Sequence, residues 1–259
     1  MTRAAVPERP QVALGFGIAP DGGTAIVSRH VEWPWSLPRG YRRAGVLGPL
    51  TVLPQCAGAA LLPGDHWRHR IELLPGAQVD LISAGALLVH ADARAPRAGR
   101  ADWRLRVAAG ALLRHVPDPV VLMPGARMEQ RIELCLELGG RAVLFDGFCR
   151  QRPDAPDMGG LWQSALRVSD PEGRVLLQDR QAVSEAELLR LRALPGAPVA
   201  FGSALVIGGA GLPEGALDLP GCHAAVGALR GGAGTMVRIA AASGGALDRA
   251  FHALRARLS

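Results

Sequence analysis

Most of the chain reads as short segments in which apolar and polar residues alternate. Residues 103–107 and 128–136 carry mainly apolar residues at every second position and mainly Arg or Glu between them. A period of two places the apolar side chains on one face of a strand and the charged ones on the other. Residues 12–16 and 24–27 lie on either side of Asp21-Gly22, which is the pattern of a hairpin.

A weak repeat in the middle of the chain indicates how these strands are arranged. Residues 74–81, 108–113 and 138–144 each place a glycine before a short apolar run, with the glycines at 76, 110 and 140. A strand-turn-strand unit that recurs every ~30 residues is typical of stacked β layers. A β-sandwich with loosely spaced turns would give the same pattern. The predicted fold is mainly β, with a stacked-strand, β-solenoid-like body.

Two helices are predicted in the C-terminal third. Ser184 and Glu187 have the spacing of a capping box in front of residues 188–191. Leu247, Phe251, Leu254 and Leu258 form an apolar stripe at helical spacing near the end of the chain. We expect residues 1–10 to be a flexible tail and residues 11–259 to form a single domain.

Charge and composition narrow the partners and the compartment. The formal net charge is +6, but the chain has no lysine, and its arginines are dispersed without a block. The charge therefore does not by itself predict nucleic-acid binding, and an acidic protein partner would explain it equally well. No apolar run approaches the ~20 residues of a membrane span, and no apolar segment follows the charged N-terminus. We expect a cytoplasmic protein that binds no membrane.

Familiar catalytic motifs do not fit the sequence. A P-loop requires a lysine, and a nucleophile elbow requires G-x-S-x-G, neither of which occurs. The four cysteines are scattered without the paired spacing of a zinc or redox site. The densest polar cluster is Asp65-His66-Trp67-Arg68-His69, where strand alternation would turn His66 and His69 to opposite faces. Asp146 interrupts an apolar run, where a charge is costly unless it is paired or hydrated.

Six segments, in this order, carry a resemblance to the UreD (UreH) family of urease accessory proteins. They are residues 48–54 (GPLTVLP), 62–65 (LPGD), 75–83 (PGAQVDLIS), 109–118 (AGALLRHVPD), 145–150 (FDGFCR) and 174–180 (RVLLQDR). No single motif is specific, and the weight lies in their order over some 200 residues.

The resemblance implies a non-enzymatic scaffold that assists nickel insertion into urease. Such proteins bind apo-urease, UreF and, through UreF, UreG, and they hold no tightly bound cofactor while nickel is in transit. Asp65 and Asp146 match acidic positions of the family and Asp118 is adjacent to one, so all three become candidate ligands on a transient nickel path. Arg150 and Arg180 end two of the matching segments and become candidate partner-binding residues.

Trp33 and Trp35 lie in a Pro-rich loop, where they are candidate anchors either for internal packing or for a partner. The sequence departs from the family pattern at Leu87 and Leu88, which replace a polar segment, and at Arg114 and Pro119, which replace glutamates. These departures predict a less polar nickel path.

Two other classes of protein remain open from the residues alone. A β-solenoid enzyme acting on a polymer would require a long groove lined by carboxylates and aromatic side chains. A basic nucleic-acid-binding protein would show strongly salt-dependent retention on a phosphate matrix.

Overall fold

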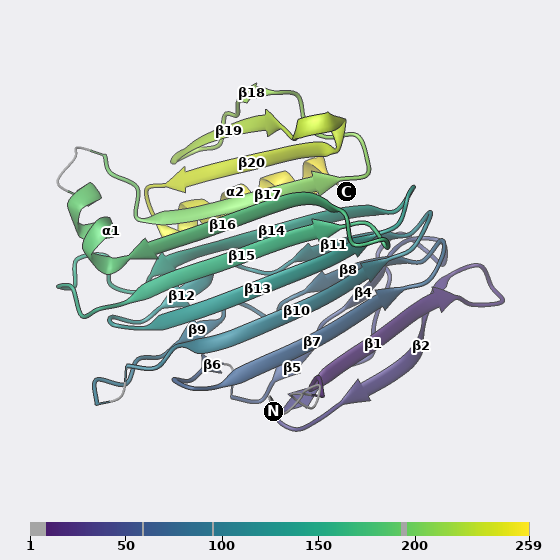
Figure 1. Cartoon of the computed structure of the whole chain (residues 1–259), viewed down its shortest axis with the longest axis horizontal. Coiled ribbons are helices and arrows are strands. Elements are labelled where there is room, and N and C mark those ends of the chain that lie inside the picture. The colour runs from purple at the N-terminus through teal and green to yellow at the C-terminus, as the bar shows by residue number, and fades with distance from the viewer. Residues whose placement is uncertain (1–8, 59, 95, 193–195, 259) are drawn as a thin grey trace, which may run out of the picture.

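A computed structural model describes residues 9–58, 60–94, 96–192 and 196–258. In these residues the strands form two large sheets and a two-stranded ribbon (Figure 1). The first sheet has the strand order β16 (Val175–Ser184), β15 (Leu161–Ser169), β13 (Arg127–Leu136), β10 (Gly99–Val107), β7 (His66–Leu73), β1 (Val12–Ile18) and β2 (Thr24–Val31).

The second sheet runs in the order β18 (Gly215–Ala216), β19 (Cys222–Ala228), β20 (Gly234–Ala241), β17 (Ala200–Ile207), β14 (Arg141–Arg150), β11 (Leu112–Val116), β8 (Gln78–Ile82) and β4 (Leu50–Val52). It is extended by β12 (Val120–Leu122), β9 (Leu88–Val89) and β6 (Ala60–Leu61). The ribbon joins β3 (Trp35–Ser36) to β5 (Gln55–Cys56).

Four long strands of the first sheet, β7, β10, β13 and β15, pair in parallel and in register. The chain passes from the first three of them into β8, β11 and β14 of the second sheet, which also pair in parallel. The turns between the sheets stack through Gly76, Gly110 and Gly139, whose φ angles are 77°, 70° and 80°. The amide of Gly76 donates to Ala109 O, and that of Gly110 donates to Gly139 O. The sequence repeat predicts Gly140 as the third turn glycine. The residue with the left-handed conformation is Gly139, one position earlier.

The main core lies between the two sheets. Ile71, Leu105 and Leu134 from the first sheet share one buried cluster with Val79 and Leu113 from the second. Strand alternation supplies one apolar face from each sheet, as the sequence pattern predicts. The outer face of the first sheet is charged, whereas the outer face of the second sheet is apolar and packs against a helix.

That helix is α2 (Gly244–Arg257), which lies behind the second sheet in Figure 1. Leu247, Phe251 and Leu254 of the predicted stripe are buried against β14, β17 and β20, and Ser243 Oγ caps the helix by accepting from Ala246 N. Gly202 makes the close packing possible, because a Cβ there would lie 2.7 Å from Phe251 Cε1.

The second helix, α1 (Glu185–Arg192), follows β16 at one end of the first sheet. The predicted capping box is formed: Ser184 N donates to Glu187 Oε2 at 2.7 Å, and Glu187 N donates to Ser184 Oγ at 3.3 Å. A short 3-10 turn, η1 (Arg230–Gly232), connects β19 to β20.

The mainly β class with two helices in the C-terminal third is confirmed. Solenoid-like winding of the whole body and the single domain over residues 11–259 stay predictions. Residues 1–8 of the predicted tail lie outside the described residues. None of the helices described here has the length and apolar character that a membrane crossing requires.

Candidate functional site

A cavity of about 430 Å³ lies between the two sheets. Both sheets line it, together with the β3–β5 ribbon and residues 83–87, which follow β8. Small side chains leave the space: Ala101 lies beside Trp67 in the register of the first sheet, and residues 84–86 are Ala-Gly-Ala. Small residues therefore line part of the cavity, alongside bulky ones such as Trp67, Trp103 and Met128.

Asp146 joins the two sheets across this cavity. It projects from β14 of the second sheet, and its carboxylate accepts Gln130 Nε2 at 2.9 Å and Ser164 Oγ at 2.6 Å, both from the first sheet. Gln130 and Ser164 are paired in register on β13 and β15, so the two donors arrive side by side. Both donors are neutral, so the carboxylate charge is not cancelled by either of them.

Burial raises the pKa of Asp146 above its usual range, and the hydrogen bonds from Ser164 and Gln130 oppose that shift. Desolvation disfavours the charged carboxylate, whereas donated hydrogen bonds favour it. The site thus holds a carboxylate whose desolvation is only partly offset by its two hydrogen-bond donors.

One end of the cavity is walled by aromatic rings. Trp35 of the ribbon meets Trp67 and His69 edge-on, at ring-centroid distances of 4.9 and 4.7 Å. His69 stacks on Trp103 at 3.9 Å, and Trp103 in turn contacts His115 at 4.4 Å. The alternation in residues 65–69 predicts that His66 and His69 lie on opposite faces of the strand, and they do. His69 is buried, whereas His66 is half-exposed and hydrogen-bonded to Asp102 at 2.8 Å.

Burial lowers the pKa of His69 to about 3 and that of His115 to about 4. Both imidazoles are therefore neutral at physiological pH. Within the described part of the chain, His115 Nδ1 is buried without a hydrogen-bond partner, and His115 lines the cavity. His115 and Asp146 thus line the same cavity, and a neutral imidazole of this kind is a common metal ligand in proteins.

Asp118 stands at the mouth of the cavity. Its Oδ2 accepts from Ser83 Oγ at 2.8 Å, and its own amide donates back to the same hydroxyl at 2.8 Å. Arg255 of α2 approaches its Oδ1 at 3.9 Å. Asp118 also lines a surface groove of about 900 Å³ beside the start of α2, and the groove and the cavity share Gly85, Ala86 and Asp118.

The structure brings together Asp146 and Asp118 but not Asp65. Asp65 occupies a turn before β7, where its Oδ2 accepts Leu62 N at 3.0 Å, and it does not line the cavity. Two of the three candidate ligands thus share one cavity, although a role for any of them in binding nickel stays a prediction.

The candidate partner-binding residues lie in different environments. Trp33 is 84% exposed, and Arg180 is exposed on β16, so both are accessible to a partner. Trp35 is half-buried in the aromatic wall. Arg150 is buried and is committed to contacts within the chain.

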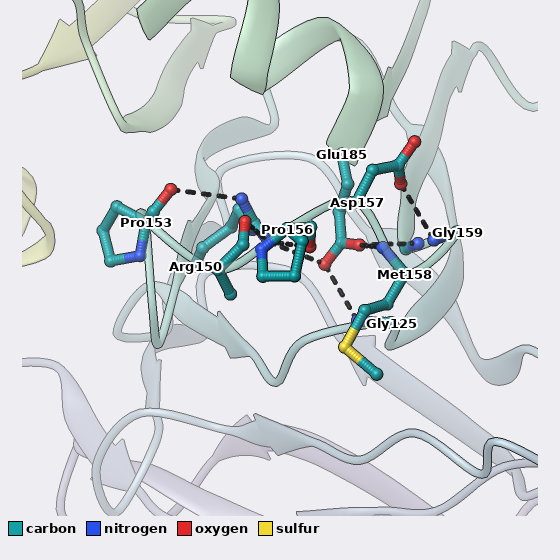
Figure 2. A network of polar contacts seen from close by, with 10 residues as sticks. Gly125, Arg150, Pro153, Pro156, Asp157, Met158, Gly159 and Glu185 are labelled. Carbon is teal, nitrogen blue, oxygen red and sulfur yellow. Dashed lines mark hydrogen bonds and ion pairs between the residues drawn. The ribbon is translucent and has the colours of Figure 1, made fainter.

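Arg150 forms an ion pair with Glu185 in the interior (Figure 2). The guanidinium donates to Glu185 Oε1 at 3.1 Å and to the carbonyls of Pro153, Ala155 and Pro156. Glu185 accepts three amides as well, from Gly125, Met158 and Gly160. This Arg150–Glu185 clamp fastens the loop after β14 to the first turn of α1.

Several residues of the site are not found by sequence reasoning. Gln130, Ser164, Ser83 and His115 are missed, although Gln130 and Ser164 are polar residues at inward positions of apolar strands, which is a usable signal. Among the departures from the family pattern, Leu87 lines the cavity and Pro119 lines the groove. Arg114 pairs with Asp80, with Nε to Oδ1 at 2.6 Å.

Comparison with known proteins gives a consistent result. The chain matches the protein family described as "UreD urease accessory protein" over residues 8–259. It is 33% identical to urease accessory protein UreD 1 of Methylorubrum populi, covering 97% of this chain and 87% of that protein. It is 33% identical to UreD of Mycolicibacterium smegmatis, covering 93% and 87%, and 27% identical to UreD 1 of Pseudomonas syringae pv. syringae, covering 92% and 87%.

The β fold and these matches define an accessory protein of urease assembly and not an enzyme. The chain belongs to the UreD family. The resemblance drawn from the six sequence segments is thereby confirmed, and the alternative of a polymer-acting enzyme is set aside.

Proposed function

We propose that this chain binds the urease apoprotein and lets nickel ions pass through its interior cavity toward the urease active site. The observation that carries the proposal is the shared lining of the cavity and the groove at Gly85, Ala86 and Asp118. A cation entering between the sheets would meet Asp146 first and Asp118 at the junction with the groove.

The donor types along this route suit a nickel ion in transit. Ni²⁺ accepts imidazole nitrogen and carboxylate oxygen, and the cavity offers the His115 ring and the Asp146 carboxylate. Among the described residues, an amide and a hydroxyl donate hydrogen bonds to the Asp146 carboxylate, and an arriving cation would offset the charge that these neutral donors leave. The apolar remainder of the wall, including Leu87 and Trp103, supplies no ligand and would keep the ion moving between isolated carboxylates.

Membership of the UreD family supports a proposal for the partners. We propose that UreF binds this chain, that UreG joins through UreF, and that the complex assembles in the cytoplasm. The exposed Trp33 is the candidate anchor for one of these contacts, because large aromatic side chains dominate many interfaces. Neither nucleic acid nor membrane has a place in this proposal.

The experiment is the Asp146→Asn variant, co-expressed with the urease subunits, UreF and UreG. The substitution removes the charge and preserves the size of the side chain. We expect the variant chain to be pulled down with urease at wild-type yield, while the nickel content per urease active site falls severalfold. Asp92→Asn is the matched control, since Asp92 is exposed, caps the amide of Arg94 and lies outside both hollows.

A wild-type nickel content in urease matured with Asp146→Asn would remove Asp146 from the route. Loss of the pull-down with either variant would show instead that the substitution disturbs assembly. Normal maturation of urease without this chain would contradict the proposal altogether.

A further inference from the structure

The outer face of the first sheet, on β7, β10, β13, β15 and β16, carries most of the excess positive charge of the chain. Alternation turns nine arginines and four carboxylates toward this face. They are Arg68, Arg70, Arg100, Arg104, Arg106, Arg127, Arg131, Arg167 and Arg180, against Glu72, Asp102, Glu129 and Glu133. Of the two described α-helices, α2 packs against the other sheet, and α1 lies beyond the end of β16.

The carboxylates of this face are engaged by nearby basic groups. Arg100 pairs with Glu129 at 3.0 Å, and Arg104 pairs with Glu133 at 3.6 Å. Arg70 lies 3.8 Å from Glu72, and Asp102 is bonded to His66 at 2.8 Å. The negative charge is thus neutralised on the β7, β10 and β13 side of the face.

Three arginines remain toward β15 and β16. Within the described residues, Arg131, Arg167 and Arg180 form no ion pair, and all three are exposed. The register places them around one small residue: Ala165 pairs with Arg131 on one side and with Arg180 on the other. Arg167 lies two residues further along the same strand, on the same face. We call Arg131, Arg167 and Arg180 the arginine triad.

The spacing within the triad suits side-chain carboxylates. Neighbouring strands are ~4.8 Å apart and residues two apart on a strand are ~6.6 Å apart, so the three arginines lie close together around Ala165. Arginine binds carboxylates through two parallel hydrogen bonds, which favours carboxylates as the groups bound around Ala165. Arg167 also borders a shallow hollow of about 400 Å³ that continues the face toward Arg104 and Arg106.

The mixture of charges indicates the kind of partner. Glu133 lies in register between Arg104 and Arg167, and Glu72 and Glu129 are close by. A continuous row of phosphates would meet these carboxylates, whereas a protein surface can place its own basic groups opposite them. We propose that the arginine triad is a docking site for an acidic segment of a partner protein. The inference is independent of nickel passage through the cavity.

The test uses the full chain and a labelled oligoglutamate peptide as the probe, with binding followed by fluorescence anisotropy at low and at physiological salt. Arg131→Gln, Arg167→Gln and Arg180→Gln are combined in one variant. The variant loses three exposed pairs at once, each of them weak, so we expect about a tenfold weaker affinity, which corresponds to ~1.4 kcal/mol. The matched control combines Arg70→Gln, Arg104→Gln and Arg106→Gln, which removes the same charge from arginines already engaged by Glu72, Glu133 and Glu137.

We expect the control variant to bind within about twofold to threefold of the wild type, because its arginines are already paired. Equal losses in the two variants would reduce the effect to net charge and overturn the docking site. Tighter binding of a single-stranded oligonucleotide of the same charge would overturn the choice of a protein partner. The single variant Arg131→Gln, at an exposed site, keeps the test open should the combined variant fold poorly.

Discussion

Asp146 places a carboxylate in the cavity and thereby lowers the stability of the surrounding core. Its position on β14 faces the opposite sheet, where its strand neighbours are apolar and buried. The carboxylate is retained by two neutral donors and remains poorly solvated, which raises its pKa. A residue selected only for stability would be neutral here, because an incompletely compensated buried charge is costly.

Replacing Asp146 by Asn should therefore stabilise the protein at neutral pH. The amide oxygen can accept from Gln130 and the amide nitrogen can donate to Ser164, without a buried charge. Because the pKa of Asp146 is raised in the folded protein, the ionised wild type loses stability as the pH rises through that pKa. We expect Asp146→Asn to melt above the wild type at pH 7, and the difference to vanish below the pKa of an unfolded aspartate, ~3.9.

Asp146→Ala provides the contrast. It leaves the amide of Gln130 and the hydroxyl of Ser164 without their acceptor, which costs ~1–3 kcal/mol. Thermal melts of the two variants across pH separate the effect of charge from that of hydrogen bonding. If Asp146→Asn melted at the same temperature as the wild type at every pH, the buried Asp146 charge would not destabilise the fold.

The buried histidines predict an opposite pH dependence. In the unfolded chain His69 and His115 gain a proton near pH 6.5, whereas in the folded protein they do so at about 3 and about 4. The unfolded state thus binds more protons below pH 6.5, and stability falls as the pH is lowered. Each residue contributes a slope of up to about 1.4 kcal/mol per pH unit.

Denaturant unfolding between roughly pH 6 and pH 5 measures this slope. His69→Phe keeps an aromatic ring against Trp103 and should remove the part of the slope that His69 contributes. The matched control is His223→Phe, since His223 is exposed on β19, and it should leave the slope unchanged. A slope that His69→Phe does not alter would show that His69 is protonated in the folded state.

At the scale of elements, the sequence predicts what is local. Alternation at residues 103–107 and 128–136 identifies β10 and β13, and the Ser184–Glu187 spacing identifies the start of α1. The Arg150–Glu185 pair is separated by 35 positions and could not be inferred, because nothing local distinguishes Arg150 from the other arginines. The same holds for Asp146, whose donors become visible only once β13 and β15 are known to be neighbours.

The Arg150–Glu185 clamp predicts a large effect of Glu185→Ala. Removing the carboxylate leaves a guanidinium buried without its counter-ion and frees three backbone amides. We expect a loss of ~3–5 kcal/mol in the free energy of unfolding, together with faster hydrogen exchange in α1 and in residues 151–160. The double variant Arg150→Met, Glu185→Leu removes both charges and should recover part of the loss. A double variant less stable than Glu185→Ala would contradict the importance of the unpaired charge.

At the scale of the whole molecule, the cavity and the groove lie where four parts of the fold meet around residues 83–87. The two sheets separate around small side chains, the ribbon of β3 and β5 covers one side, and α2 borders the other. Neither hollow could be predicted from the sequence, since each is lined by elements that are far apart along the chain. The fold class follows from periodic patterns, whereas the site follows from how the layers are stacked.

The continuity of the two hollows can be tested by steric closure. Ala86 is exposed, lines both the cavity and the groove, and offers no ligand atom from its side chain. Ala86→Trp would fill the junction while Asp146, Asp118 and His115 stay in place. If nickel passes there, urease matured with this variant should contain severalfold less nickel although the pull-down yield is unchanged. Ala225→Trp, at an exposed site on β19, is the matched control, and equal nickel contents with the two variants would mean that the ion takes another way.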